Sequence, residues 1–319
     1  MQYDVFNGDA DGIIALLQLQ LYNPTNSVKI TGVKRDIALL KRVDVKAGDT
    51  IRVLDISMEK NLEALNNALV MGADVFYVDH HRTGDIPKSD NLKAYIDLDA
   101  NTCTSLIISK LLDNEFHLWA ITAAYGDNLF AKADEEADKL GLTLQQKQQL
   151  KAFGTYINYN SYGNDVSDLH YPPTELFEML LAYSSPFDVI NKVDSVYHKL
   201  STAYDYDMEK SRAAEVLFDS KVAKVILLED AAWSRRVSGV LGNDLANQSP
   251  SKAHAVISYN NEGGYTVSVR APLLNKQGAD IVCSHFKTGG GRTAAAGINH
   301  LDRSELSEFI RVLSDYYTS

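Results

Sequence analysis

Two adjacent histidines behind a carboxylate, Asp79-His80-His81, follow the apolar run Asp74–Val78. Imidazole nitrogens and carboxylate oxygens bind divalent metals, and an imidazole can also hold or transfer a proton. We expect the triplet at the end of a strand, which is where open α/β sheets place their functional sites. Packing alone does not explain such a cluster, so the triplet is the strongest chemical signal in the chain.

Four more aspartates each follow an apolar segment. They are Asp9 and Asp11 after Tyr3–Phe6, Asp55 after Ile51–Leu54, and Asp127 after Leu118–Ala124. Each alone has an ordinary explanation, because Asp favours turns and helix N-termini. Together with the triplet they fit a centre of two divalent cations. Oxygen-rich ligands with one or two imidazoles favour Mn²⁺ or Mg²⁺ over cysteine-rich zinc chemistry.

The first half of the chain alternates strand and helix patterns. The expected strands are Tyr3–Phe6, Lys29–Val33, Thr50–Leu54, Asp74–Val78 and Lys93–Ile96. The expected helices are Gly12–Tyr22, Arg35–Val43, Lys60–Met71 and Thr102–Leu112, with Ser57 and Asn101 or Thr102 as helix caps, and a mostly helical stretch follows from Leu118 to Ala182. This rhythm predicts an α/β fold with a doubly wound, mostly parallel sheet.

The second half predicts a smaller α/β domain with a mixed sheet. After a break at Ser184-Ser185-Pro186, the pattern is helical over Phe187–Leu217. There follow a strand (Ala223–Leu228), a helix (Ser234–Ala246), a hairpin (Ala253–Tyr259 and Tyr265–Arg270), a helix (Gly278–Phe286), a Gly289–Gly291 turn and a terminal helix. We expect a first domain at 1–185, a helical linker at 186–217 and a second domain at 218–319.

Composition limits the function classes. The 319 residues carry a formal net charge of −11, which argues against a broad basic surface for long nucleic acid. No apolar stretch approaches the roughly 20 residues of a membrane helix, and no signal-peptide pattern is present, so we expect a cytoplasmic protein. The two cysteines, Cys103 and Cys283, suggest neither a disulfide framework nor a thiolate site.

These residues resemble a known family. The set Asp9-x-Asp11-Gly12, Asp55, Asp79-His80-His81 and Asp127 is similar to the four motifs of the DHH phosphoesterase superfamily. The run Gly-Gly-Gly-Arg-Thr-Ala-Ala-Ala-Gly at 289–297 resembles the signature of its DHH-associated domain. The motifs span nearly the whole chain in the expected order. The superfamily includes RecJ-like exonucleases, nano-RNases, phosphatases of 3′-phosphoadenosine 5′-phosphate and cyclic-dinucleotide phosphodiesterases.

The resemblance implies a site with two Mn²⁺ ions, with Mg²⁺ as the alternative metal. Matched by position, the implied roles are Asp9 on the first ion, Asp11 on the second, Asp55 bridging both, and His80 and Asp127 completing the second site. His81 would face the scissile phosphate. Asp79 would orient an imidazole or add a further ligand. The implied catalytic residues are thus Asp55, Asp79 and His81.

The resemblance also implies phosphate contacts in the second domain. These are Arg270, Gly289, Gly290, Gly291 and Arg292. Two positions depart from the family pattern. Val5 stands where a metal-binding histidine usually precedes the first motif by four residues, so the first ion loses a nitrogen ligand. Arg292 stands where a histidine usually follows the glycines, and its permanent charge suits binding rather than acid–base work.

The leading hypothesis is a metal-dependent phosphodiesterase that cuts short linear nucleotides, such as pGpG, to mononucleotides. The alternatives are a 3′-phosphoadenosine 5′-phosphate phosphatase, a cyclic-dinucleotide phosphodiesterase and, outside enzymes, a nucleotide-binding module with weakened catalysis. We expect a short nucleotide as partner, without long nucleic acid or membrane, and a homodimer is left open. Lys34-Arg35 and Arg235-Arg236 are expected to be solvated charges.

Overall fold

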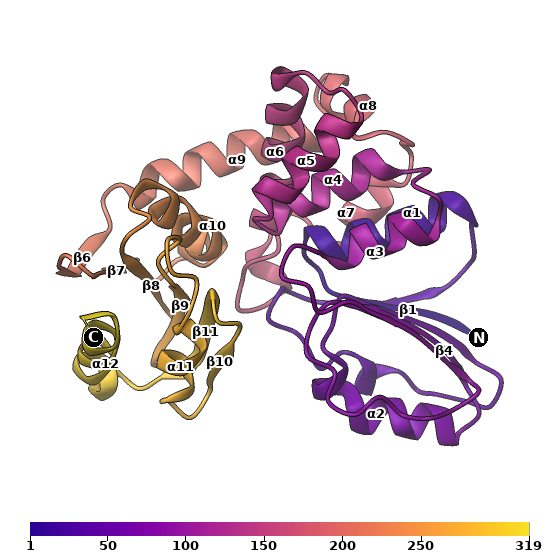
Figure 1. Ribbon diagram of the computed structural model, residues 1–319, viewed down its shortest axis with the longest axis horizontal. Coiled ribbons are helices and arrows are strands. Elements are labelled where there is room, and N and C mark those ends of the chain that lie inside the picture. Colours follow the sequence, from indigo (N-terminus) through magenta and orange to yellow (C-terminus); the bar gives the residue numbers. More distant parts are fainter. Residues whose placement is uncertain (319) are drawn as a thin grey trace. The chain divides into compact units, whose positions relative to one another are not determined.

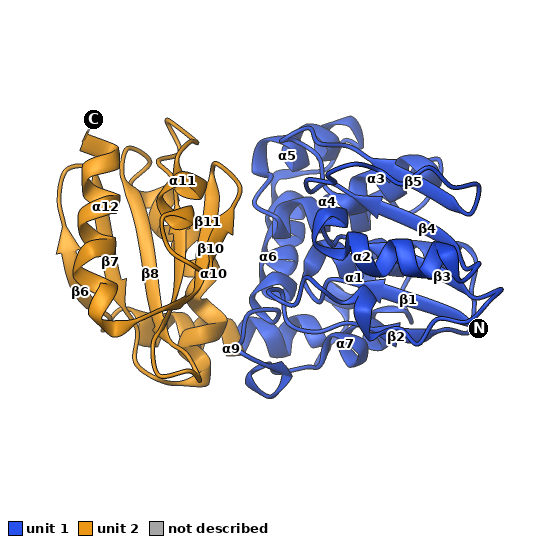
Figure 2. Ribbon diagram, turned by 90° about the horizontal axis from the view of Figure 1, so that it is seen from below, with its two compact units in different colours: residues 1–202 blue, residues 203–319 orange. Residues whose placement is uncertain are grey.

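The computed structural model describes residues 1–318, which divide into two compact units at residue 202 (Figure 2). Helix α9 (Val196–Ser211) runs through this division. Each unit is built on a sheet of its own, five-stranded in the first and six-stranded in the second. Within residues 1–318, no helix has both the length and the apolar character needed to cross a membrane.

The sheet of the first unit is parallel throughout. It consists of β1 (Gln2–Phe6), β2 (Val28–Ile30), β3 (Thr50–Leu54), β4 (Asp74–Asp79) and β5 (Leu92–Ile96). Their order is β2-β1-β3-β4-β5, so the direction of winding reverses between β1 and β3. In open α/β sheets such a reversal leaves a crevice beyond the carboxyl ends of the two strands. The predicted fold class is confirmed.

Helices cover both faces of this sheet. Helix α2 (Met58–Val70) lies on one face, and α1 (Ala10–Tyr22) and α3 (Thr104–Leu111) lie on the other (Figure 1). Strand side chains alternate between the faces, which gives each face its own core. Phe6, Leu54 and Val78 pack on the α1 side, and Val5, Val53 and Tyr77 pack on the α2 side.

The remaining helices of the first unit gather on the α1 side. They are α4 (His117–Gly126), α5 (Phe130–Lys139), α6 (Leu144–Tyr159), α7 (Pro173–Leu180) and α8 (Pro186–Asn191). Helix α4 approaches α1 and α6 closely at Gly126. A Cβ on this glycine would lie 2.6 Å from the Cβ of Ala10 and 2.7 Å from the carbonyl oxygen of Gly154. This close packing fixes the end of α4, where Asp127 follows.

The helix predicted over Arg35–Val43 is wrong. Only Leu40–Arg42 forms a turn of 3₁₀ helix. The side chain of Asn61 on α2 accepts from the backbone N–H of Leu40 (3.1 Å) and donates to the carbonyl of Ile37 (2.7 Å). A side chain from another element therefore satisfies the backbone groups that a helix would have paired internally.

The second unit has a mixed sheet with helices on both faces. Its strands are β6 (Glu215–Asp219), β7 (Ala223–Leu227), β8 (Ala253–Tyr259), β9 (Tyr265–Arg270), β10 (Gly289–Gly291) and β11 (Ala295–Leu301), in the order β10-β11-β9-β8-β7-β6. Only β7 and β8 pair in parallel. Helix α10 (Ala232–Gln248) packs on β8 and β9, whereas α11 (Ala279–Ser284) and α12 (Leu306–Thr318) join the core cluster of the sheet. The predicted hairpin β8–β9 is confirmed.

Two predictions in this unit are wrong. The helical pattern does not extend to Leu217, because β6 begins at Glu215. The glycines at 289–291 form the edge strand β10 rather than a turn, and the turn follows at 292–295, where the N–H of Arg292 donates to the carbonyl of Ala295 (2.9 Å). Gly291 has φ +145°, and a Cβ there would lie 2.5 Å from the Cα of Ala296. Only glycine fits that pairing.

Candidate metal centre

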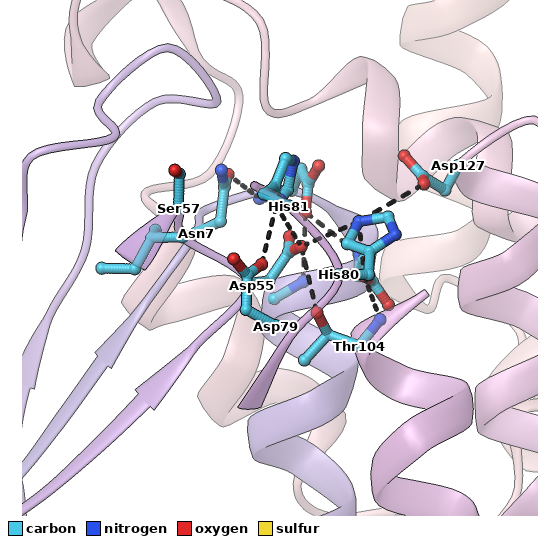
Figure 3. Close-up of polar contacts among 12 residues, drawn as sticks. Asn7, Asp55, Ser57, Asp79, His80, His81, Thr104 and Asp127 are labelled. Atoms are coloured by element: carbon cyan, nitrogen blue, oxygen red, sulfur yellow. Dashed lines mark hydrogen bonds and ion pairs between the residues drawn. The ribbon is translucent and has the colours of Figure 1, made fainter. Parts of the chain in front are cut away.

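The carboxyl ends of β1, β3 and β4 bring the first three motifs together. The N–H of Asn7 donates to the carbonyl of Leu54 (3.2 Å), and the N–H of Asp55 donates to the carbonyl of Val78 (3.1 Å). These bonds hold the loops side by side at the point where the winding of the sheet reverses. Figure 3 shows Asp55 and His80 within this cluster.

Asp55 leaves β3 with a backbone that few residue types accept. Its φ of +58° lies in the left-handed region, which Asp tolerates better than bulkier residues do. Its Oδ1 accepts from the hydroxyl of Thr104 (3.2 Å) and lies 3.4 Å from the Nε2 of His80. The strained turn therefore serves to aim this carboxylate at the imidazole.

Asp11 lies in the first turn of α1 and caps a different helix, α3. Its two oxygens accept from the backbone N–H groups of Thr104 and Ser105, both at 2.7 Å. The predicted capping of α3 by Asn101 or Thr102 is wrong, because Asp11 supplies the cap from 93 residues away. The cap fixes this carboxylate with its Oδ2 3.7 Å from the Nε2 of His80.

Asp127 follows helix α4, at the start of the stretch that was predicted to be mostly helical. A carboxylate at a helix C-terminus is disfavoured by the helix dipole, so helix stability does not explain the residue. Its Oδ2 lies 3.9 Å from the Nε2 of His80, and its Oδ1 lies 3.8 Å from the Nζ of Lys34. The carboxylate of Asp127 thus faces both an imidazole nitrogen and an ammonium nitrogen.

The hydrogen bonding of His80 directs one nitrogen into the cluster. Its Nδ1 lies 2.9 Å from the carbonyl oxygen of Thr102, and only a protonated Nδ1 can bond there. In the neutral imidazole the Nε2 then carries the lone pair. That atom faces one oxygen each of Asp55, Asp11 and Asp127, at 3.4, 3.7 and 3.9 Å.

This donor set fits a divalent cation. Two donors on one Mg²⁺ can lie no more than about 4.2 Å apart, because each bond is about 2.1 Å long. All three distances from the Nε2 of His80 meet that limit. One ligand atom each of Asp55, His80 and His81 also falls within 4.8 Å of the others. Burial, together with the carboxylates of Asp11 and Asp9, raises the pKa of Asp55 well above its usual value, so the cluster is short of positive charge.

Asp79 and His81 form a second feature of the site. The Nδ1 of His81 lies 2.7 Å from the Oδ1 of Asp79, a carboxylate that is fully buried. The side chain of His81 is 28% exposed, against 2% for His80 and Asp55. His81 is thus the histidine that an incoming molecule can reach, and Asp79 fixes its orientation.

Lys34 corrects an expectation, because it is not a solvated surface charge. Its ammonium forms an ion pair with the Oδ2 of Asp9 and donates to the side-chain oxygen of Asn158 (3.1 Å). Burial alone raises the pKa of the Asp9 carboxyl, but the ammonium outweighs that effect and lowers the pKa to about 2. The Oδ1 of Asp9 accepts from the N–H groups of Asp11 and Gly12, each at 3.1 Å.

Val5 supplies no polar group to the site. Its side chain is fully buried in the apolar core on the α2 side of the sheet. The environment of Asp9 therefore differs from that of Asp11 and Asp55. An ammonium pairs with Asp9, whereas the imidazole of His80 faces the other two carboxylates.

In the second unit, Arg270 ends β9 with its side chain against α10. Its guanidinium donates to the side-chain oxygen of Asn243 (2.5 Å), the hydroxyl of Ser268 (3.1 Å) and the carbonyls of Val269 (3.1 Å) and Gly239 (3.2 Å). All four acceptors are neutral. They orient the guanidinium without neutralising its charge, which suits an anion.

The remaining predicted phosphate contacts lie at the same end of this sheet. Arg270 pairs in register with Ala295, and Gly291 pairs with Ala296. The exposed Arg292 begins the turn between them. The sheet thus brings Arg270, Arg292 and the glycine strand β10 together.

Sequence reasoning missed four residues that shape the first unit's site. They are Lys34 and Asn158, beside Asp9, and Thr102 and Thr104, which hold His80 and Asp55. None belongs to a motif, and Thr102 acts through its backbone carbonyl. The position of both threonines in the first turn of the helix predicted over Thr102–Leu112 was the one available signal.

No family model matches the sequence, and no curated protein matches it either. Solved structures do match. The exonuclease RecJ bound to manganese is 16% identical to the chain with a TM-score of 0.63, covering 99% of this chain and 90% of that one. RecJ in complex with Mn²⁺ from Thermus thermophilus is 14% identical, with a TM-score of 0.56 over 99% of this chain and 52% of that one.

A pGpG-specific phosphodiesterase, PggH from Vibrio cholerae, is 11% identical with a TM-score of 0.54, covering 100% of this chain and 99% of that one. At such identities the likeness concerns the fold. The parallel sheet of the first unit and the mixed sheet of the second agree with it. The chain therefore has the two-domain α/β fold of the RecJ-like DHH phosphoesterases.

Proposed function

We propose that the chain is a divalent-metal-dependent phosphodiesterase of the DHH superfamily that cuts short linear nucleotides, such as pGpG, to mononucleotides. One observation carries the proposal: the Nε2 of His80 faces oxygens of Asp55, Asp11 and Asp127 at 3.4 to 3.9 Å. These four side chains would hold Mn²⁺ or Mg²⁺. A bound ion supplies two effects, because it lowers the pKa of water and offsets negative charge on a phosphoryl group.

His81 is the side chain proposed to meet the substrate. The Nδ1 of His81 is held by Asp79, so the Nε2 is the nitrogen proposed to contact the substrate. In the imidazolium form this Nε2–H donates to a phosphate oxygen and can give its proton to the leaving 3′ oxygen. The partial exposure of His81 supports this role, since a substrate must reach the atom that protonates it.

Arg270 and Arg292 are the proposed phosphate-binding cations. Arg270 is already oriented by four neutral acceptors, so little side-chain freedom is lost when an anion binds. Strand β10 adds backbone groups. A Cβ on Gly290 would meet no described atom within 4 Å, so a phosphate could approach the main chain at this residue.

Two observations support a short substrate. The formal net charge of −11 disfavours the extended basic surface that long nucleic acids need. The likeness to the pGpG-specific phosphodiesterase extends over 99% of that protein. A substrate with one or two phosphates would need few cations, and Arg270 and Arg292 are two such groups.

The test is product analysis by mass spectrometry. The enzyme is incubated with Mn²⁺ or Mg²⁺ and, separately, with pGpG, a cyclic dinucleotide, 3′-phosphoadenosine 5′-phosphate and a long RNA. We expect GMP from pGpG and little product from the long RNA. His81→Ala should abolish turnover, whereas the exposed Asp85→Ala is the control. Equal rates on long RNA would refute the short-substrate proposal, and inactivity on every ester would refute phosphodiesterase function.

A further inference from the structure

We propose that the ammonium of Lys34 takes, beside Asp9, the place of a second metal ion, so that the site binds one divalent cation per chain. The inference rests on the proposed function for the identity of the metal ligands. It departs from the two-ion expectation, because the surroundings of Asp9 do not fit a second ion.

The contacts of the Lys34 ammonium resemble those of a bound cation. Its Nζ forms an ion pair with the Oδ2 of Asp9, donates to the side-chain oxygen of Asn158 at 3.1 Å, and lies 3.8 Å from the Oδ1 of Asp127. The ring of Tyr162 lies 5.6 Å away, measured to its centroid. Oxygen atoms and an aromatic face therefore surround a positive charge that the chain itself supplies.

The backbone holds this lysine in place. The N–H of Lys34 donates to the carbonyl of Ser161 (2.9 Å), and the carbonyl of Lys34 accepts from the side chain of Asn7 (3.3 Å). Its side chain is 24% exposed, whereas that of Asp9 is 5% exposed. A carboxylate as buried as that of Asp9 is seldom found without a partner, so its pair with Lys34 is a built feature of the site.

Asp9 has little capacity left for a metal. Its Oδ1 accepts from two backbone N–H groups, those of Asp11 and Gly12, and its Oδ2 pairs with Lys34. Val5 offers no ligand, because it lies in the core on the α2 side of the sheet. An ion beside Asp9 would have to displace the ammonium and would find no imidazole from position 5.

Asp127 separates the two positions. Its Oδ1 faces the Nζ of Lys34 at 3.8 Å, and its Oδ2 faces the Nε2 of His80 at 3.9 Å. The carboxylate of Asp127 thus lies between a fixed ammonium and the other proposed ligands of the single ion, Asp11, Asp55 and His80. The ammonium carries one charge where a second divalent ion would carry two.

The test counts Mn²⁺ per full-length chain by calorimetry and elemental analysis, with electron paramagnetic resonance to detect a spin-coupled ion pair. We expect one Mn²⁺ and no coupled signal. In Lys34→Met, which removes the charge and keeps a similar length, we expect a second, weaker Mn²⁺ and the coupled signal. Lys34→Arg keeps the charge and should stay at one ion. Lys41→Met, at an exposed position, is the matched control.

Two tightly bound, coupled Mn²⁺ ions in the unaltered protein would overturn the inference. One ion in Lys34→Met would also overturn it, because Lys34 would then not be what excludes the second. One ion in the unaltered protein, two in Lys34→Met, and no hydrolysis of any ester would refute the proposed function and support the inference. Failure to bind Mn²⁺ at all would refute both. If Lys34→Met does not fold, the count in the unaltered protein still decides whether the site binds one ion or two.

Discussion

The Nδ1 of His81 lies 2.7 Å from the Oδ1 of Asp79, and this carboxylate is fully buried while the imidazole is partly exposed. A buried carboxylate that accepts from one ring nitrogen fixes the tautomer and the orientation of the imidazole. We therefore expect Asp79 to be a positioning residue that acts through His81, although it is the first residue of the Asp-His-His motif.

Replacement of Asp79 by Asn should lower kcat by about 10- to 100-fold, because the amide can present an N–H to His81 and favour the wrong tautomer. The tautomer of His81 can be read from its ring ¹⁵N shifts by NMR, which a purely structural role would leave unchanged. Asp85→Asn, at an exposed position in the next loop, should change neither quantity. An Asp79→Asn variant with normal kcat and tautomer would contradict this role.

Thr104 joins two carboxylates of the centre, since its N–H donates to Asp11 and its hydroxyl donates to Asp55. Thr104→Val keeps the side-chain shape and the N–H but removes the hydroxyl. We expect Mn²⁺ affinity to fall about tenfold, measured by calorimetry. Thr104→Ser keeps the hydroxyl and should retain most of the affinity. If Thr104→Val binds Mn²⁺ as tightly as the unaltered protein does, the hydroxyl does not orient Asp55.

Substitutions at two glycines of strand β10 should have different effects, one on stability and the other on substrate binding. A Cβ on Gly289 would lie 1.7 Å from the carbonyl oxygen of Cys283, whereas one on Gly290 would meet no described atom within 4 Å. We expect Gly289→Ala to lower the free energy of unfolding by about 1–3 kcal/mol in denaturant titration. Gly290→Ala should leave stability unchanged and raise KM for pGpG. An unchanged KM would remove β10 from the phosphate site.

The local motifs were predictable because each lies in one short stretch of chain. Strand-like runs that end at Asp55 and at Asp79-His80-His81 predicted that these residues lie at the carboxyl ends of strands. The hairpin β8–β9 followed from its Gly-Gly turn and β-rich flanks. The parallel sheet followed from the alternation of strand and helix.

Long-range contacts were not predictable in this way. The capping of α3 by Asp11 joins residues 93 apart, and the pairing of Lys34 with Asp9 depends on where α6 places Asn158. Similarly, no α-helix forms over Arg35–Val43, where the side chain of Asn61 bonds the backbone groups of Ile37 and Leu40. Such contacts leave no periodic pattern, because only the assembled fold brings the partners together.

Metal binding should be linked to pH through Asp55. Burial and the carboxylates of Asp11 and Asp9 raise the pKa of Asp55 well above its usual value in the metal-free protein. A group whose pKa is raised by folding contributes stability at low pH, and that contribution is lost as the pH rises towards the folded-state pKa. The Tm of the metal-free protein should therefore fall as the pH rises from the ordinary pKa of an aspartate to the raised pKa of Asp55.

A divalent ion binds the carboxylate form, so it must expel the proton from Asp55, and Mn²⁺ affinity should rise with pH over the same interval. Calorimetry in two buffers of different ionisation enthalpy counts the protons released. Asp55→Asn, which has no proton to release, should give a smaller count and a flatter Tm profile without metal, even if its Mn²⁺ affinity is low. If affinity is independent of pH and no proton is released, Asp55 is already ionised before the metal binds and the charge deficit inferred for the cluster is wrong.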